Sequence, residues 1–186
     1  ETLVDIRLNI AGRHNVRNAL AAAACTLALG VPAEAIVRGL AAFEPVSGRL
    51  RRTHTAQGVP LIDDTYNANP DSMRAAIDVL ADQPAPRLMV MGDMGETGAQ
   101  AEAFHREVGE YAVSRAIEQV WAVGKDMKAA AQMSGVQHWE TVEALLAEHP
   151  QAPTGIASIL VKGSRFMKME RVVRAWAETA SPQGEH

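Results

Sequence analysis

Residues 87–98 read Arg-Leu-Met-Val-Met-Gly-Asp-Met-Gly-Glu-Thr-Gly, an apolar run that passes directly into a glycine-rich loop. The run is short and does not alternate with polar residues, so it predicts a strand that is covered on both faces. A long helix is predicted next, from about 99 to 115. This succession of strand, loop and helix occurs four times after residue 58. The predicted strands are 59–64, 87–91, 119–123 and 156–161, and the helices that follow them are 71–81, 99–115, 126–133 with 141–148, and 167–179.

Short apolar strands that alternate with helices predict an α/β fold, with a mostly parallel sheet and helices on both of its faces. The first part of the chain has a different pattern. Residues 2–10 alternate between apolar and polar side chains and predict a half-buried strand, and helices are expected over 16–29 and 32–42, with Asn15 as the N-cap of the first. A domain boundary is predicted at residue 48, which gives domains 1–48 and 49–186, and 181–186 are expected to be a frayed tail.

The composition excludes several classes of protein. The net charge of −4 over 186 residues argues against a general nucleic-acid binder. Cys25 is the only cysteine, so neither a disulfide framework nor a cysteine-rich metal site is expected, and the histidines lack metal-binding spacing. No apolar run is long enough to span a membrane, and no signal peptide is visible, so the cytoplasm is the expected compartment. Because the chain begins with Glu1 rather than Met, we expect it to be a fragment of a longer protein or a processed product.

Polar and glycine residues follow each predicted strand. They are Asp63-Asp64, the Gly92 loop, Gly124-Lys125 and Lys162-Gly-Ser-Arg165. Ligands of parallel sheets bind beyond the carboxyl ends of the strands, so these segments predict a site at one sheet edge. Adjacent side chains of a strand face opposite ways, so only one of Asp63 and Asp64 is expected to meet a given ligand.

Each segment also has a simpler interpretation. Asn69 and Pro70 favour a helix start, the glycines from 92 to 98 suit an ordinary turn, and the basic residues from 162 to 165 suit a solvated loop. Asn15 and Asn18 lie three apart at a helix start, where two carboxamides could bind a base edge or simply cap the helix. Arg49 could clamp a phosphoryl group, although runs of exposed arginines are more often solvated.

Taken together, five strings resemble the Mur ligase family. These are Gly-Arg-His-Asn-Val-x-Asn-Ala-Leu-Ala-Ala from residue 12, Ser-Gly-Arg-Leu from 47, Asp-Asp-Thr-Tyr-Asn-Ala-Asn-Pro-Asp-Ser-Met from 63, Met-Gly-Asp-Met-Gly-Glu from 91 and Val-Lys-Gly-Ser-Arg from 161. The resemblance covers residues 3–175. It implies that 1–48 are the end of a central ATP-binding domain, with helices that remain from it, and that 49–186 are a Rossmann-like C-terminal domain.

The resemblance also implies a reaction and a set of site residues. The reaction would use ATP and Mg²⁺ to convert the carboxylate of UDP-N-acetylmuramoyl-tripeptide into an acyl phosphate, which the amine of D-alanyl-D-alanine attacks. Arg49 would be catalytic. The implied nucleotide-binding residues are His14, Asn15, Asn18, Arg49, Asp64, Tyr66 and Asn67, and the implied substrate-binding residues are Asp93, Glu96, Lys162, Ser164 and Arg165.

Three parts of the family's machinery are absent from these 186 residues: the Gly-Lys-Thr phosphate loop, the lysine–histidine–glutamate part of the Mg²⁺ site, and the sugar-binding domain. The resemblance therefore implies that Mg²⁺ is bound mainly by the central domain, and that the chain by itself ligates nothing. A monomer is expected, with no partner nucleic acid or membrane. The alternatives are a stand-alone α/β module that binds a nucleotide or peptide without catalysis, and a domain that only docks to a partner.

Overall fold

The computed structural model describes residues 4–177. Contacts divide the chain into two compact units, residues 1–46 and residues 47–186. The predicted tail at 181–186 and the ends of two predicted elements lie outside the described residues. Each unit is described by itself.

The first unit contains two helices, α1 (Arg13–Ala28) and α2 (Ala33–Ala41). The predicted strand at 2–10 is wrong over its described part, since residues 4–10 form no strand and pair with no other segment among residues 4–177. Alternation alone cannot make a strand without a neighbour to accept its hydrogen bonds. The N-cap prediction is also wrong, because α1 begins earlier, after Gly12 with its φ of 100°.

The first unit has almost no core of its own. Ile36 is the only buried residue among 4–46, and Leu20, Leu27 and Phe43 are exposed. With so little apolar burial, we expect backbone amides of α1 and α2 to exchange with solvent about a hundredfold or more faster than those of the second unit's central strands. Hydrogen exchange followed by NMR on the whole chain measures this. Equal protection in α1 and in the central strands would contradict the expectation.

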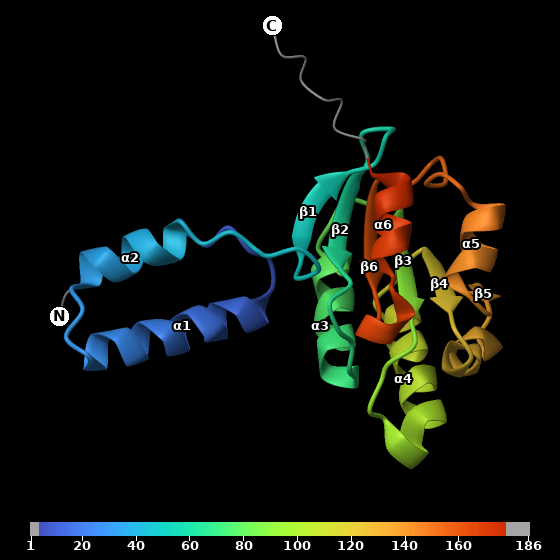
Figure 1. Cartoon of the computed structure of the whole chain (residues 1–186), viewed down its shortest axis with the longest axis horizontal. Helices are drawn as coiled ribbons and strands as arrows, with labels where there is room; N and C mark the ends of the chain where they lie inside the picture. Colours follow the sequence, from blue (N-terminus) through green and yellow to red (C-terminus); the bar gives the residue numbers. More distant parts are fainter. Residues whose placement is uncertain (1–3, 178–186) are drawn as a thin grey trace, which may run out of the picture. The chain divides into compact units, whose positions relative to one another are not determined.

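The second unit is built on one six-stranded sheet (Figure 1). Its strands are β1 (Arg51–His54), β2 (Pro60–Asp64), β3 (Arg87–Gly92), β4 (Gln119–Val123), β5 (Val136–Trp139) and β6 (Ser158–Lys162). Their order in the sheet is β1-β2-β6-β3-β4-β5, and every neighbouring pair is parallel except β1 with β2. The four predicted strands and the mostly parallel α/β fold are confirmed. The two edge strands, β1 and β5, were not predicted.

Helices cover both faces of this sheet. They are α3 (Pro70–Ala81), α4 (Ala101–Ser114), α5 (Val142–Glu148) and α6 (Glu170–Trp176), together with 3-10 turns η1 (Gly98–Gln100), η2 (Asp126–Gln132) and η3 (Arg165–Met167). The α3 start is as predicted: the Asn69 side chain accepts from the Ser72 N–H, the Ser72 hydroxyl oxygen accepts from the Asn69 N–H, and Pro70 begins the helix. The last helix begins three residues later than predicted, at 170.

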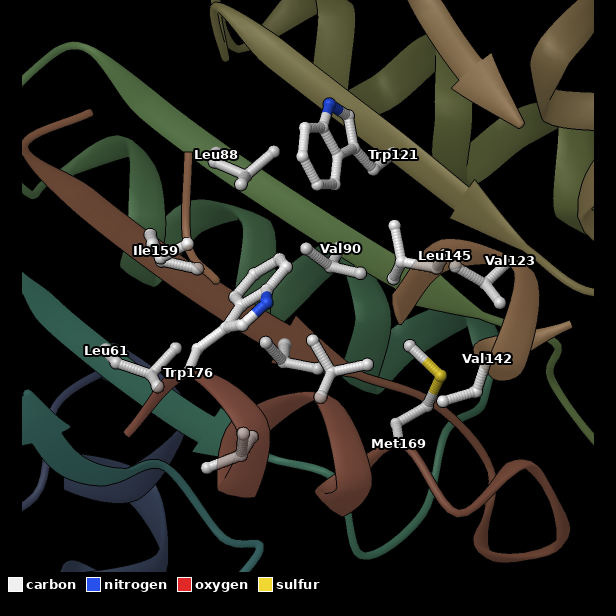
Figure 2. Close-up of a cluster of buried hydrophobic side chains, with 14 of the residues drawn as sticks. Leu61, Leu88, Val90, Trp121, Val123, Val142, Leu145, Ile159, Met169 and Trp176 are labelled. Atoms are coloured by element: carbon white, nitrogen blue, oxygen red, sulfur yellow. The ribbon is translucent and has the colours of Figure 1, made fainter. Parts of the chain in front are cut away.

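Alternation along the strands separates two apolar layers. Leu61, Val90 and Ile159 face α5 and α6 (Figure 2). In this layer Trp176 and Trp121 meet edge to face, with ring centroids 5.9 Å apart. On the other face, α3 and α4 pack on β3, β4 and β6. Most side chains of both layers are buried, so the polar residues that follow the strands are held on a closely packed scaffold.

Candidate functional site

The carboxyl ends of β2, β6, β3 and β4 lie at one edge of the sheet, because these strands are parallel and adjacent. Direct contacts join the segments that follow them. Lys162, the last residue of β6, contacts Asp64, the last residue of β2, and Ser164, after β6, contacts the loop after β3. The predicted gathering of polar residues at one edge is therefore confirmed, whereas the roles of the individual residues stay predictions.

Asp63 and Asp64 point to opposite sides, as predicted from their adjacency. Asp63 is buried, and its carboxylate accepts hydrogen bonds from the Gly48 N–H (3.0 Å) and from the Thr65 hydroxyl (2.6 Å). It thus ties the entry of the second unit to the end of β2. Asp64 faces the other way, where Oδ1 accepts from the Leu50 N–H at 3.1 Å and Oδ2 accepts from Lys162 Nζ at 2.7 Å.

Lys162 forms a buried ion pair at this edge. Its side chain is 4% exposed and that of Asp64 is 13% exposed, so the pair has little contact with water. The ammonium also donates to the carbonyl oxygen of Asn67 at 2.8 Å. One cation therefore holds both the carboxylate and the backbone of the segment that precedes α3. An ion pair of this kind is a fixed dipole beside which a charged ligand can be positioned.

Ser164 joins two loops. Its hydroxyl donates to the carbonyl oxygen of Ala68 at 3.1 Å and accepts from the N–H of Gly95 at 2.6 Å. Ser164 is 2% exposed, and its described contacts are all with the scaffold. It positions the loop after β3 relative to the segment before α3, and its predicted contact with substrate stays a prediction.

Asp93 is turned into the protein. It is 6% exposed, and its Oδ1 accepts from the Met127 N–H at 2.8 Å. The rest of the loop is held by His105, a buried residue that the sequence analysis did not single out. His105 Nε2 accepts from the Met94 N–H at 2.8 Å, so the ring proton lies on Nδ1, 2.6 Å from the Ala101 carbonyl oxygen. No local motif marks this histidine, because its partner lies eleven positions earlier.

Burial raises the pKa of the Asp93 carboxyl, although the Met127 and Asp126 N–H groups oppose the rise. A carboxyl whose pKa is higher in the folded state favours folding less once it ionises. We therefore expect the stability of the chain relative to that of Asp93→Asn to fall as the pH rises from about 4 through the raised pKa. Urea unfolding of both proteins at several pH values measures this. A difference that stays constant, or grows with pH, would show that the carboxyl is not penalised by burial.

The remaining predicted residues are exposed at the mouth of this edge. The Arg49 guanidinium lies over the Tyr66 ring, 4.3 Å from its centroid, a cation–π contact that orients both side chains. Glu96 stands at the tip of its loop with φ 59°, and Arg165 forms a weak ion pair with Glu170 at 3.4 Å. Asn67 is exposed too. These groups are accessible to a ligand, in contrast to the buried Asp93 and Ser164.

His14, Asn15 and Asn18 lie together in the first unit. Asn18 Nδ2 donates to Asn15 Oδ1 at 3.3 Å, and Asn15 Nδ2 donates to the Ala11 carbonyl at 2.7 Å and lies 3.0 Å from His14 Nε2. The carboxamides share one face of α1, as their spacing predicted. Whether they bind a base stays a prediction.

Residues 4–177 contain neither a metal-ligand cluster nor a helix that could span a membrane. No group of three or more His, Cys, Asp or Glu side chains there could hold a metal ion. None of the helices in this range is long and apolar enough to cross a bilayer.

Residues 48–165 match the family described as Mur ligase, glutamate ligase domain. The chain is 45% identical over 181 residues to the UDP-N-acetylmuramoyl-tripeptide--D-alanyl-D-alanine ligase of Escherichia coli K12, covering 96% of this chain and 40% of that protein. It is 38% identical to the ligase of the same name from Haemophilus influenzae, over 91% of this chain and 38% of that one. The chain thus spans about two-fifths of the length of these curated relatives.

Solved structures give the same picture. A crystal structure of MurF from Acinetobacter baumannii superposes with a TM-score of 0.80 at 39% identity, over 91% of this chain and 38% of that one. MurF from Thermotoga maritima, solved in complex with ADP, has a TM-score of 0.79 at 23% identity, with 91% and 39% coverage. At that lower identity the likeness concerns the fold alone.

Proposed function

The chain belongs to the Mur ligase family, and from this membership we propose that it is the C-terminal part of an ATP-dependent ligase of peptidoglycan precursor synthesis. The reaction would join D-alanyl-D-alanine to UDP-N-acetylmuramoyl-tripeptide. The observation that carries the proposal is the 45% identity, over 96% of this chain, to a curated ligase of that name. The described chain would supply the acceptor side of the reaction, and the rest of a longer protein would supply the phosphate loop.

In this proposal ATP supplies the phosphoryl group that activates a carboxylate for attack by an amine. Arg49 would then stabilise charge on the phosphates, because its guanidinium is exposed and oriented by Tyr66. Asp64 would accept a ribose hydroxyl, since each carboxylate oxygen can accept more than the one bond that it has here. Asn67 would border the nucleotide, and His14, Asn15 and Asn18 would face its base.

The dipeptide and the tripeptide end would bind at the loops after β3 and β6. Glu96 and Arg165 are exposed there and carry opposite charges, which suits an ammonium and a carboxylate. Three buried residues would act indirectly, because they hold these loops in place and do not need to touch the ligand. They are Lys162, Ser164 and Asp93.

Mg²⁺ would be held mainly by the central domain, as the resemblance implies. The described residues offer no cluster of metal ligands, and the Asp64 carboxylate that a cation could use already faces the Lys162 ammonium. We further propose a cytoplasmic location, because the proposed substrates are a nucleotide-linked sugar peptide and a free dipeptide. The monomer expected from the sequence stays a prediction.

A chimera tests the proposal. The part of the Escherichia coli ligase that precedes the aligned region would be joined to this chain, and release of phosphate from ATP would be measured with UDP-N-acetylmuramoyl-tripeptide and D-alanyl-D-alanine. We expect turnover that depends on both peptides. Arg49→Met should abolish most of it, whereas Arg52→Met, on the same segment, should not.

The isolated 186 residues provide the matched negative control, since we expect no turnover from them. If the chimera folds and binds nucleotide but never releases phosphate, the proposal is wrong. The chain would then be the non-catalytic nucleotide- or peptide-binding module that its sequence left open.

A further inference from the structure

One polar side chain lies on the buried face of α4. That face is a stripe of residues three and four apart, which consists of His105, Val108, Gly109 and Ala112. The imidazole of His105 is 0% exposed. An apolar side chain would fill this position without polar atoms that need partners, so the two ring nitrogens indicate a role beyond packing.

Both ring nitrogens of His105 contact backbone groups. Nδ1 lies 2.6 Å from the carbonyl oxygen of Ala101, one turn earlier on the same helix. Nε2 accepts from the N–H of Met94 at 2.8 Å, and Met94 is itself buried, two residues beyond the end of β3. This N–H lies outside the strand ladder and needs an acceptor from elsewhere. The imidazole supplies it, which an apolar side chain could not do.

Met94 is the middle one of three consecutive residues that fix the loop after β3, residues 93–97. Before it, the carbonyl oxygen of Asp93 accepts from the Ser164 N–H at 3.0 Å. After it, the N–H of Gly95 donates to the Ser164 hydroxyl at 2.6 Å. Glu96 follows directly, with φ 59°. The loop after β6 and helix α4 therefore hold the backbone from which Glu96 projects.

Among these contacts, the one to the imidazole depends on protonation near neutral pH. The hydroxyl and backbone groups do not titrate there, whereas histidine side chains do. The neutral ring with its proton on Nδ1 accepts at Nε2, but an imidazolium has N–H groups at both positions and accepts nothing. Uptake of a proton would set the His105 Nε2–H against the Met94 N–H, so the contact would break.

Charged groups on the elements around His105 bear on this proton. The loop presents the Asp93 carboxylate, whose charge attracts that of a protonated His105, and η2 carries Asp126, which acts on Asp93. This attraction opposes the loss of the Met94 hydrogen bond. The charged side chains of α3 that reach α4 are engaged elsewhere, in the contacts of Arg74 with Glu107 and of Asp78 with Tyr111.

We propose that His105 is a positioning residue: as the neutral imidazole it holds residues 93–97 in the conformation that places Glu96, and uptake of a proton releases them. His105 would touch no substrate, because it is fully buried. The consequence for the dipeptide, which involves Glu96, rests on the proposed function. The contact between His105 and Met94 does not, so it is tested on the chain itself.

Amide hydrogen exchange of the whole 15N-labelled chain is the first test. His105→Leu is apolar and offers no acceptor to the Met94 N–H. At about pH 7.5 we expect the exchange rate of the Met94 amide, divided by that of Val90 in β3, to rise about tenfold or more. His105→Gln should keep this ratio within about threefold of the native value, because its amide oxygen can accept in place of Nε2.

The pH dependence separates the proton from the packing. The amide signal of Met94 should shift in the native chain as the pH is lowered from about 8 to about 5, and it should stay constant in His105→Gln. Asp93 is present in both proteins, so a shift that survives in His105→Gln would belong to Asp93 and overturn the proposal. A native signal that does not move over this range would overturn it too.

Val108→Ala is the matched control, because it removes buried apolar atoms from the same face of α4. It should destabilise the chain and leave both the exchange ratio and the pH response as they are in the native protein. Equal effects of His105→Leu and Val108→Ala on the exchange ratio would show that His105 serves packing alone, against the proposal.

The chimera tests the consequence for the reaction. His105→Leu should raise the KM for D-alanyl-D-alanine about tenfold and leave the KM for ATP within about twofold, because the loop is proposed to meet the dipeptide. Equal KM values for the dipeptide in both proteins would contradict the positioning role. A native chimera without turnover would count against the ligase proposal instead, and the exchange and shift measurements would still decide the role of His105.

Discussion

Replacing Gly124 with alanine should destabilise the second unit by about 3 kcal/mol or more. Gly124 follows β4 with φ 122°, a backbone conformation that side chains rarely adopt. A Cβ at this position would overlap the carboxyl group of Asp93. Asp93 cannot move aside without losing its hydrogen bond to the N–H of Met127, so the overlap cannot be relieved cheaply. Urea unfolding of the whole chain, monitored by tryptophan fluorescence, measures the loss.

A second glycine separates the cost of the backbone conformation from the cost of the overlap with Asp93. Gly155 has φ 78°, and a Cβ there would meet nothing within 4 Å. Gly155→Ala should therefore cost only about 1 kcal/mol, from backbone strain alone. If Gly124→Ala and Gly155→Ala destabilise the protein equally, then the packing of Asp93 against Gly124 adds nothing to the loss of stability.

Replacing Lys162 with methionine should destabilise the second unit about as much as Gly124→Ala does, but for an electrostatic reason. It would leave the Asp64 carboxylate in a nearly dry site with only the Leu50 N–H as donor. Breaking a buried ion pair by removing one partner typically costs about 3–5 kcal/mol. The carbonyl of Asn67 would lose its donor as well, so we expect the segment before α3 to loosen and the chimera to lose activity.

The double variant Asp64→Asn with Lys162→Met tests this explanation. Without the carboxylate there is no buried charge to leave unpaired, so the double variant should be more stable than Lys162→Met alone, as measured by urea unfolding. Lys168→Met, an exposed lysine six positions later, should change stability by less than about 0.5 kcal/mol. A double variant less stable than Lys162→Met would mean that Asp64 stabilises the fold by other contacts.

The central part of the fold was predictable because its signals are local. The β3 run is apolar at almost every position, and Asn69-Pro70 with Ser72 specifies the start of α3 within four residues. The clustering of Asp64 with Lys162 also followed, since parallel strands bring their carboxyl ends together. The sequence does not show which strand each edge strand, β1 or β5, pairs with. β1 contains Arg51 and Arg52, which resemble a solvated charge run until the register with β2 places one of them over Asp63.

The inward residues of the site were harder to predict than the outward ones. Asp93 and Ser164 are polar residues in loops after strands, a position typical of ligand contacts, yet both are buried and hold loops together. The decisive partners are distant in the sequence: Gly95 lies 69 positions from Ser164, and Met127 lies 34 from Asp93. Single-sequence patterns carry no information on such pairs. The wrong prediction of a strand at 2–10 has a similar origin, because a strand needs a neighbour to pair with and the pattern does not show whether one is present.

The strand order has a consequence for how the protein is made. β6 lies between β2 and β3 in the sheet, although it is the last strand to leave the ribosome. Until it emerges, β2 and the β1 hairpin have no place in the sheet, and the Asp64–Lys162 pair, 98 positions apart, cannot form. During synthesis β1 and β2 therefore stay unpaired with the rest of the sheet until β6 has emerged. A chain cut before residue 158 would lack the strand that joins β2 to β3.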